Sequence, residues 1–151
     1  MNIRRVEYLE VSEGLLVSYI HNKITEDLGK LGVIVAIDKD EPIWFGRKQD
    51  SNGARITTFL KDENILGYPE KLIQSPPSHP YDYVANYIHE NKWDNKKIGV
   101  EMDSYYYTAE NHNRLVKQCP NAIFKNGHLL VNWIRYIKSD VEITYMKQAA
   151  K

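Results

Sequence analysis

The sequence has one cysteine, no long apolar run and no excess of charge of either sign. Its 151 residues carry 20 Lys and Arg against 20 Asp and Glu, so the formal net charge is zero. Such a balance creates no general attraction for nucleic acid or for an anionic membrane. We therefore expect neither as a partner, and any ligand must be recognised by a local group of side chains.

The single cysteine, Cys119, excludes an internal disulfide. No apolar run has the length of a signal peptide or of a membrane-spanning helix. These absences together predict a reducing, cytoplasmic setting. Because Cys119 falls on the apolar side of a predicted helix, we interpret it as a buried, inert thiol rather than a reactive one.

Motifs for metal or nucleophilic chemistry are also lacking. The five histidines, at positions 21, 79, 89, 112 and 128, include no i, i+4 pair and no His-Glu-x-x-His spacing, so we expect no metal site. No phosphate-binding loop and no Gly-x-Ser-x-Gly elbow occurs. His112 lies on the apolar side of a predicted helix, where a hydrogen-bonded core histidine is favoured over a ligand.

Two weaker signals have ordinary explanations. Glu101 and Asp103 would alternate along a predicted strand and could hold Mg²⁺ from one face. A nuclease would need more carboxylates on neighbouring strands, and Asp38 and Asp50 fall in turns, where Asp is common anyway. The tyrosines 105–107 could stack on bases, but no Lys or Arg flanks them, so helix packing is favoured.

Chain length and hydrophobic pattern predict one α/β domain over residues 1–151, without a linker. Apolar spacing predicts one helix that begins near Asp82 and a second, later helix that ends at Pro120. A strand, helix, strand order makes the last two strands parallel, so the fold class is a mixed β-sheet flanked by helices. The expected strands are 14–18, 32–37, 43–45, 54–60, 65–68, 97–102 and 122–124.

Turn residues predict the connections between these elements. The turn at 38–42 makes strand 43–45 an antiparallel return, and Asn52-Gly53 predicts a tight turn with positive φ before strand 54–60. Prolines 76, 77 and 80 predict an extended segment at 74–80.

A capping box predicts the last helix. Ser139 and Glu142 have the spacing of this motif, and Ile143, Met146 and Ala150 then share one face. No glycine or proline stops this helix before residue 151, so we expect more protein to follow it.

The stretch 41–55 holds the densest group of candidate binding residues. Arg47 and Arg55 offer planar forks suited to a carboxylate, and Asp50 could take a cation or orient one of the arginines. The alternative is that the arginines form surface ion pairs with Glu41, Asp50 or Asp62, each of little energetic value. Composition alone favours the ion pairs.

Four ordered blocks, however, carry a family resemblance. The pattern Trp-Phe-Gly-Arg-x-Gln-Asp-x-x-Gly-Ala-Arg at 44–55 resembles the ectoine hydrolase branch of the creatinase, prolidase and aminopeptidase P family. The further blocks are 68–80, 98–106 and 131–150, in the family's order. The four blocks are typical of the family's N-terminal domain.

This resemblance implies a ribonuclease-H-like domain without catalytic residues. In the family, a second domain of the pita-bread fold carries out hydrolysis, and it would begin after residue 151. Peptidase members bind two divalent metal ions there, whereas creatinase-like members work without them. We therefore expect this chain alone to be inactive and to hold no cofactor, and we expect its missing C-terminal catalytic domain to be a partner.

The resemblance also implies a homodimer in which the N-terminal domain helps to shape the partner subunit's active site. Residues 1–40 depart from the family pattern, because 19–31 is polar and lacks the aromatic substrate-approaching loop. A free-standing binding or regulatory module with the same fold is the alternative. The residues to which we assign a position near the substrate or the interface are Trp44, Arg47, Gln49, Asp50, Arg55 and His79.

Overall fold

A computed structural model describes residues 14–18 and 32–151 of the chain. The described residues fall into two compact units, one up to His128 and one from Leu129 to Lys151, and each is described by itself. The prediction that 19–31 lacks the family's loop lies outside the described residues. The assignment of 1–151 to a single domain stays a prediction.

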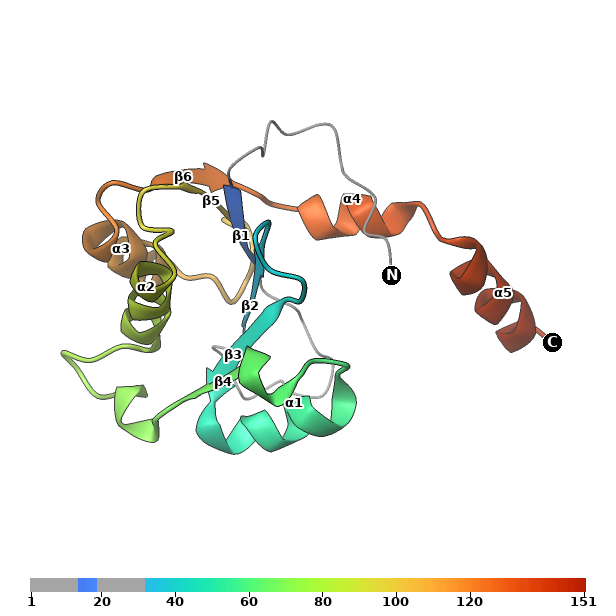
Figure 1. Cartoon of the computed structure of the whole chain (residues 1–151), viewed down its shortest axis with the longest axis horizontal. Helices are drawn as coiled ribbons and strands as arrows, with labels where there is room; N and C mark the ends of the chain where they lie inside the picture. The colour runs from blue at the N-terminus through green and yellow to red at the C-terminus, as the bar shows by residue number, and fades with distance from the viewer. Residues whose placement is uncertain (1–13, 19–31) are drawn as a thin grey trace. The chain divides into compact units, whose positions relative to one another are not determined.

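The first unit is built on a six-stranded mixed sheet in the order β4-β3-β2-β1-β5-β6 (Figure 1). Strand β2 pairs antiparallel with both β1 and β3, whereas the pairs β1 with β5, β5 with β6 and β3 with β4 are parallel. The predicted fold class and the predicted parallel pairing of the last two strands are confirmed. The strands are β1 Gly14–Ser18, β2 Gly32–Ala36, β3 Ile43–Arg47, β4 Ile65–Tyr68, β5 Lys97–Val100 and β6 Ile123–Asn126.

The alternation of side chains along β2 and β3 divides the core between the two faces of the sheet. Ile34 and Phe45 point into the larger cluster, which packs against helices α2 Pro80–Glu90 and α3 Ala109–Gln118. Val33 and Trp44 point into the smaller cluster, which helix α1 Ser51–Thr57 covers with Ala54. Helices α2 and α3 lie side by side in Figure 1. The sheet is therefore flanked by helices, as predicted.

Local capping explains where α2 and α3 begin. His79 caps α2, with Pro80 in the first turn, and Thr108 Oγ1 accepts from Asn111 N at the start of α3. The buried line of α3 is Asn111, Leu115 and Cys119, at i, i+4 and i+8. Helix packing was the favoured interpretation of tyrosines 105–107, but Tyr105 precedes α3 and is 89% exposed, whereas Tyr107 is buried.

The predicted strand at 54–60 is wrong, because the chain forms helix α1 Ser51–Thr57. Gly53 has no positive φ, so Asn52-Gly53 is not the predicted tight turn. The hydroxyl of Ser51 donates to Lys48 O at 2.7 Å, and the hydroxyl of Thr57 donates to Gly53 O at 2.8 Å. Both bonds are local and compatible with a helix, and the burial of Ala54 against the sheet outweighs the strand preference of Ile56 and Thr57.

Two smaller predictions also fail. Strand β5 ends at Val100, so Glu101 and Asp103 do not alternate along a strand, and Asp103 Oδ2 lies 3.4 Å from His128 Nε2. Segment 74–80 is not extended throughout: Gln74 has a φ of 48°, and Ser78 N donates to Ser75 O at 3.0 Å in a turn. Proline fixes its own φ but does not prevent its neighbours from turning.

The second unit contains helices α4 Leu130–Tyr136 and α5 Asp140–Ala149. The predicted capping box is confirmed, since Ser139 N donates to Glu142 Oε2 at 2.7 Å and Glu142 N donates to Ser139 Oγ at 3.3 Å. Ile143 and Met146, on the predicted apolar face, are exposed. None of the helices in the described ranges is long and apolar enough to cross a bilayer.

Candidate functional site

Arg47, at the end of β3, is held by two neighbouring side chains. Its Nη2 donates to both carboxylate oxygens of Glu70, at 3.0 and 3.1 Å, and its Nε donates to Oε1 at 3.1 Å. The amide oxygen of Gln49, in the orientation that satisfies both amide atoms, accepts from Nε and Nη1 at 3.3 and 3.2 Å. Arg47 is therefore paired, as the ion-pair interpretation expected, but with Glu70 rather than Glu41, Asp50 or Asp62.

The turn after Arg47 is pressed against β4. Residues Lys48–Asp50 form a single 3₁₀ turn, η1, and a Cβ added to Gly67 of β4 would lie 2.9 Å from the Lys48 Cα. Only a glycine permits this approach without displacement of one backbone. The close packing fixes Gln49 and Asp50 beside Arg47.

Asp50 is the unusual group of this cluster. Its Oδ2 is buried and has no hydrogen-bond partner in the described part of the chain, and its side chain does not cap α1. Burial raises the pKa of the Asp50 carboxyl, against the opposing charge of Arg47. A buried carboxylate oxygen without a hydrogen bond costs stability. Asp50 is therefore a candidate to take up a proton or to bind a new hydrogen-bond partner.

Arg55 and Trp44 have different surroundings. Arg55 Nε donates to Asp62 Oδ1 at 3.1 Å, which confirms the ion pair that the sequence favoured, and its Nη1 donates to Ser51 Oγ at 2.7 Å. Trp44 is buried in the smaller core beneath α1. The structure therefore brings together Arg47, Gln49 and Asp50, and it gives Arg55 and Trp44 separate, structural contacts.

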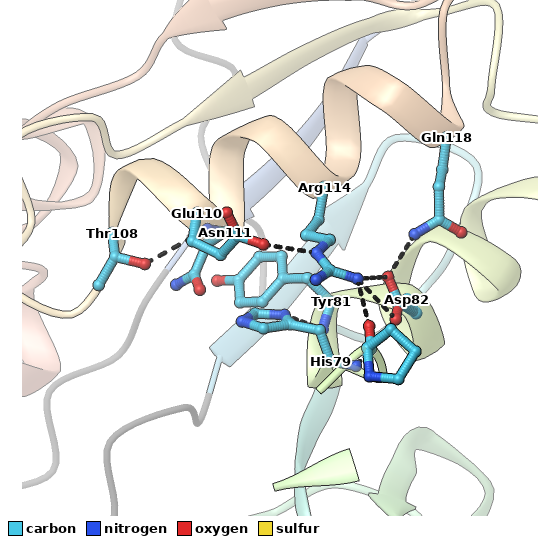
Figure 2. Close-up of polar contacts among 9 residues, drawn as sticks. His79, Tyr81, Asp82, Thr108, Glu110, Asn111, Arg114 and Gln118 are labelled. Carbon is cyan, nitrogen blue, oxygen red and sulfur yellow. Dashed lines mark hydrogen bonds and ion pairs between the residues drawn. The ribbon is translucent and has the colours of Figure 1, made fainter. Parts of the chain in front are cut away.

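His79 lies at the start of α2, in a second polar cluster (Figure 2). Its Nδ1 accepts from Tyr81 N at 3.1 Å, which places the proton of the neutral ring on Nε2. Its backbone N–H donates to Asp82 Oδ2 at 2.8 Å, completing a capping box. The imidazole is mostly buried.

Helix α3 completes this second cluster. Arg114 Nη1 donates to Pro77 O at 2.8 Å and lies 3.4 Å from both oxygens of Asp82. Gln118 Nε2 donates to Asp82 Oδ1 at 2.6 Å, and Arg114 Nε donates to Glu110 Oε1 at 2.6 Å. Sequence reasoning missed Arg114. Its i, i+4 spacing from Glu110 was visible, but its contacts with residues before α3 were not.

The remaining reactive side chains have structural partners. Cys119 is buried, and burial raises its pKa to about 11, which agrees with the predicted inert thiol. His89 Nε2 lies 3.9 Å from Cys119 Sγ but only 2.8 Å from Gln118 O. His112 Nδ1 lies 3.1 Å from the Tyr107 hydroxyl, as expected of a hydrogen-bonded core histidine. Within the described ranges, no three His, Cys, Asp or Glu residues converge on a metal position.

Comparison with known proteins identifies the family of this chain. Residues 13–137 match the creatinase/prolidase N-terminal domain. An uncharacterized hydrolase/peptidase of Sinorhizobium fredii is 44% identical over 117 residues, which are 78% of this chain and 30% of that protein. The ectoine hydrolase of Halomonas elongata is 43% identical over 112 residues, which are 74% of this chain and 28% of that protein.

The fold has a counterpart among solved structures. The N-terminal domain of the Xaa-Pro dipeptidase from Lactobacillus brevis aligns with a TM-score of 0.54 at 12% identity, over 82% of this chain and 87% of that domain. At this identity the similarity concerns the fold alone. This chain spans less than a third of the length of the Sinorhizobium fredii and Halomonas elongata hydrolases. It belongs to the creatinase/prolidase N-terminal domain family, as its sequence blocks predicted.

Proposed function

We propose that this chain is the non-catalytic N-terminal domain of a longer creatinase/aminopeptidase P-type hydrolase that acts, like ectoine hydrolase, on a C–N amide-type bond. The observation that carries the proposal is the 43% identity to ectoine hydrolase over a segment that makes up 28% of that enzyme. Catalysis would belong to the remaining part of the protein. Two divalent metal ions would bind there if the parent is of the peptidase branch.

The chemistry of the described residues is consistent with an inactive domain. The Cys119 thiol is buried and protonated at neutral pH, and the neighbouring His89 gives its Nε2 to a backbone carbonyl. A nucleophile needs an accessible thiolate or hydroxyl beside a free base. The contribution of this domain would instead be to position and to shape a site completed elsewhere.

The second unit offers a surface for the missing catalytic domain. Its two helices bury none of their own residues. Several large apolar side chains that stay exposed along one short segment favour an interaction surface over free solvent contact. We propose that the C-terminal catalytic domain covers it. Its exposed residues include Trp133, Tyr136, Ile137, Val141, Tyr145 and Met146.

The first unit would supply the contacts near the substrate. Arg47, Gln49 and Asp50 share one cluster, in which the Arg47 fork, paired with Glu70, lies beside an acid of raised pKa. We propose that this cluster faces the active site of the partner subunit in a cytoplasmic homodimer. His79 would contribute from the α2 end, whereas Trp44 and Arg55 would act by supporting the fold around the cluster.

The proposal is tested by expressing residues 1–151 and the full-length reading frame side by side. We expect the chain alone to hydrolyse neither ectoine, creatine nor Xaa-Pro peptides, with or without Mn²⁺ or Zn²⁺, and the longer protein to hydrolyse one of them. Turnover that stays with the purified short chain would contradict the proposal. A reading frame that stops after Lys151 would favour a free-standing binding or regulatory module instead.

A further inference from the structure

Segment 74–79, which leads into α2, is tied to a helix distant in the sequence. Ser78 N donates to Ser75 O at 3.0 Å and closes a turn within the segment. Arg114 of α3 donates from Nη1 to Pro77 O at 2.8 Å. Figure 2 shows the Arg114 guanidinium reaching from α3 toward Asp82 at the start of α2. One side chain thus contacts both the turn and the helix that the turn precedes.

The Arg114 guanidinium serves three groups at once. Nε donates to Glu110 Oε1 at 2.6 Å, while Nη1 reaches Pro77 O and, at 3.4 Å, both oxygens of Asp82. The side chains of Arg114 and Asp82 are each only 28% exposed, so water competes weakly for these contacts. The planar fork fixes the angle between its partners, which a lysine ammonium cannot do.

Asp82 in turn determines the position of His79. Its Oδ2 accepts the backbone N–H of His79 at 2.8 Å, and its Oδ1 accepts from Gln118 at 2.6 Å. With the carboxylate held from α3, the His79 backbone is fixed, and its Nδ1 can accept from Tyr81 N at 3.1 Å. The proton of the ring is thereby kept on Nε2.

We propose that Arg114 is a positioning residue for His79: acting through Pro77 and Asp82, it holds segment 74–79 in place and keeps the His79 ring in the Nε2–H tautomer. The inference rests on the proposed function only in the part that assigns His79 to the substrate site. A role limited to helix stability would need only the Glu110 pair within α3. The contact with Pro77 O adds nothing to α3 itself, and it is this contact that links α3 to the turn.

The test uses the chain of residues 1–151 with three variants. Arg114→Met removes the hydrogen bonds and keeps most of the packing, Arg114→Lys keeps the charge without the fork, and Lys117→Met is the matched control at an exposed position of the same helix. Hydrogen exchange of a peptide covering 74–79 reports on the turn. Long-range ¹H–¹⁵N correlation of the imidazole reports on the tautomer of His79.

We expect Arg114→Met to speed hydrogen exchange in segment 74–79 by about tenfold, because the turn loses the hydrogen bond from Arg114 to Pro77 O that holds it against α3. Exchange in β5 should stay unchanged, and the His79 ring should populate both tautomers. Arg114→Lys should give a smaller change in the same direction, and Lys117→Met none. A folded Arg114→Met protein with unchanged exchange and an unchanged tautomer would overturn the proposal. If Arg114→Met does not fold, the same two outcomes apply to Arg114→Lys.

Kinetics of the full-length protein separate this inference from the proposed function. Arg114→Met and His79→Ala should each lower kcat/KM, and the double variant should lose no more than His79→Ala alone, because both act through one group. A full-length protein with no hydrolase activity would contradict the proposed function and leave the exchange and tautomer results valid. An active Arg114→Met enzyme with loosened 74–79 and wild-type kinetics would remove His79 from the substrate site.

Discussion

Asp82 and Asp50 occupy comparable places in the first unit, each within the first residues of a helix or next to it, yet their surroundings are opposite. Asp82 accepts from a backbone N–H and from Gln118 and lies beside Arg114. Asp50 lies near Arg47, but its buried Oδ2 has no hydrogen-bond donor among the described residues, and Arg47 is occupied by Glu70. A fully satisfied buried network fixes structure, whereas an unsatisfied one costs stability and is retained for another reason. Asp82 is therefore a group that stabilises the fold, whereas Asp50 is a candidate binding group.

The largest effect is expected from Asp82→Ala. The variant loses the α2 capping box, leaves the donors of His79 and Gln118 without their acceptor, and removes one of the three partners of Arg114. We expect a loss of about 2–3 kcal/mol in the free energy of unfolding. Urea titration followed by circular dichroism measures it, with Asn86→Ala at an exposed position of α2 as the control. A loss no larger than that of the control would mean that the hydrogen bonds around Asp82 do not stabilise the fold.

Asp50→Asn should raise the free energy of unfolding, whereas Asp82→Ala lowers it. Because burial raises the Asp50 pKa, the folded chain holds its proton to higher pH than the unfolded chain, and its contribution to stability falls as pH rises through that window. The neutral amide avoids this cost, so we expect a gain of about 0.5–1 kcal/mol near pH 7. The gain should shrink toward about pH 4, where the wild-type carboxyl is protonated more often.

Thermal melts at both pH values measure the effect, with the exposed Asp40→Asn as the control. A gain that is the same at both pH values would show that the charge of Asp50 is not the cause. A loss of stability near pH 7 would show that Asp50 has a favourable partner in the folded protein.

The smallest stability effects are expected at the two arginines. Arg47 and Glu70 have side chains 25% and 51% exposed, so removing this ion pair should cost less than about 1 kcal/mol. In the full-length hydrolase, however, Arg47→Ala should lower kcat/KM by about tenfold if the fork meets the substrate, because it removes a charge-assisted hydrogen bond. Arg55→Ala is the matched comparison, since Arg55 is paired with Asp62 and supports α1. Wild-type KM and kcat in both variants would reduce both arginines to surface ion pairs.

Much of the fold follows from short-range signals in the sequence. Short apolar runs predict β1 and β2, the second rich in β-branched residues, and the Ser139 and Glu142 spacing predicts the start of α5, because each signal depends only on neighbours in the chain. Helix α1 was missed because the burial of Ala54 against Val33, Trp44 and Ile65 favours the helix. These contacts are tertiary, and no window of sequence contains them.

The site shows the same limit. Arg47, Gln49 and Asp50 lie together because they are close in sequence and meet at one turn. The Arg47 pair with Glu70 and the Arg114 contact with Pro77 join residues more than twenty positions apart. Only the fold brings them within hydrogen-bond distance. The family resemblance identified the domain, but it could not distinguish the paired arginine from the unpaired acid.

The position of β1 has a consequence for how the sheet assembles. Leu15 is the register partner of Ala36 on one side and of Ile98 on the other, so β1 joins an early meander to a late strand, helix, strand unit. Closing the second of these pairings requires a long excursion of the chain, which slows folding relative to the local hairpin. Removal of the first eighteen residues would therefore not trim the sheet but divide it, leaving β2 and β5 as two unprotected edges open to pairing with other chains.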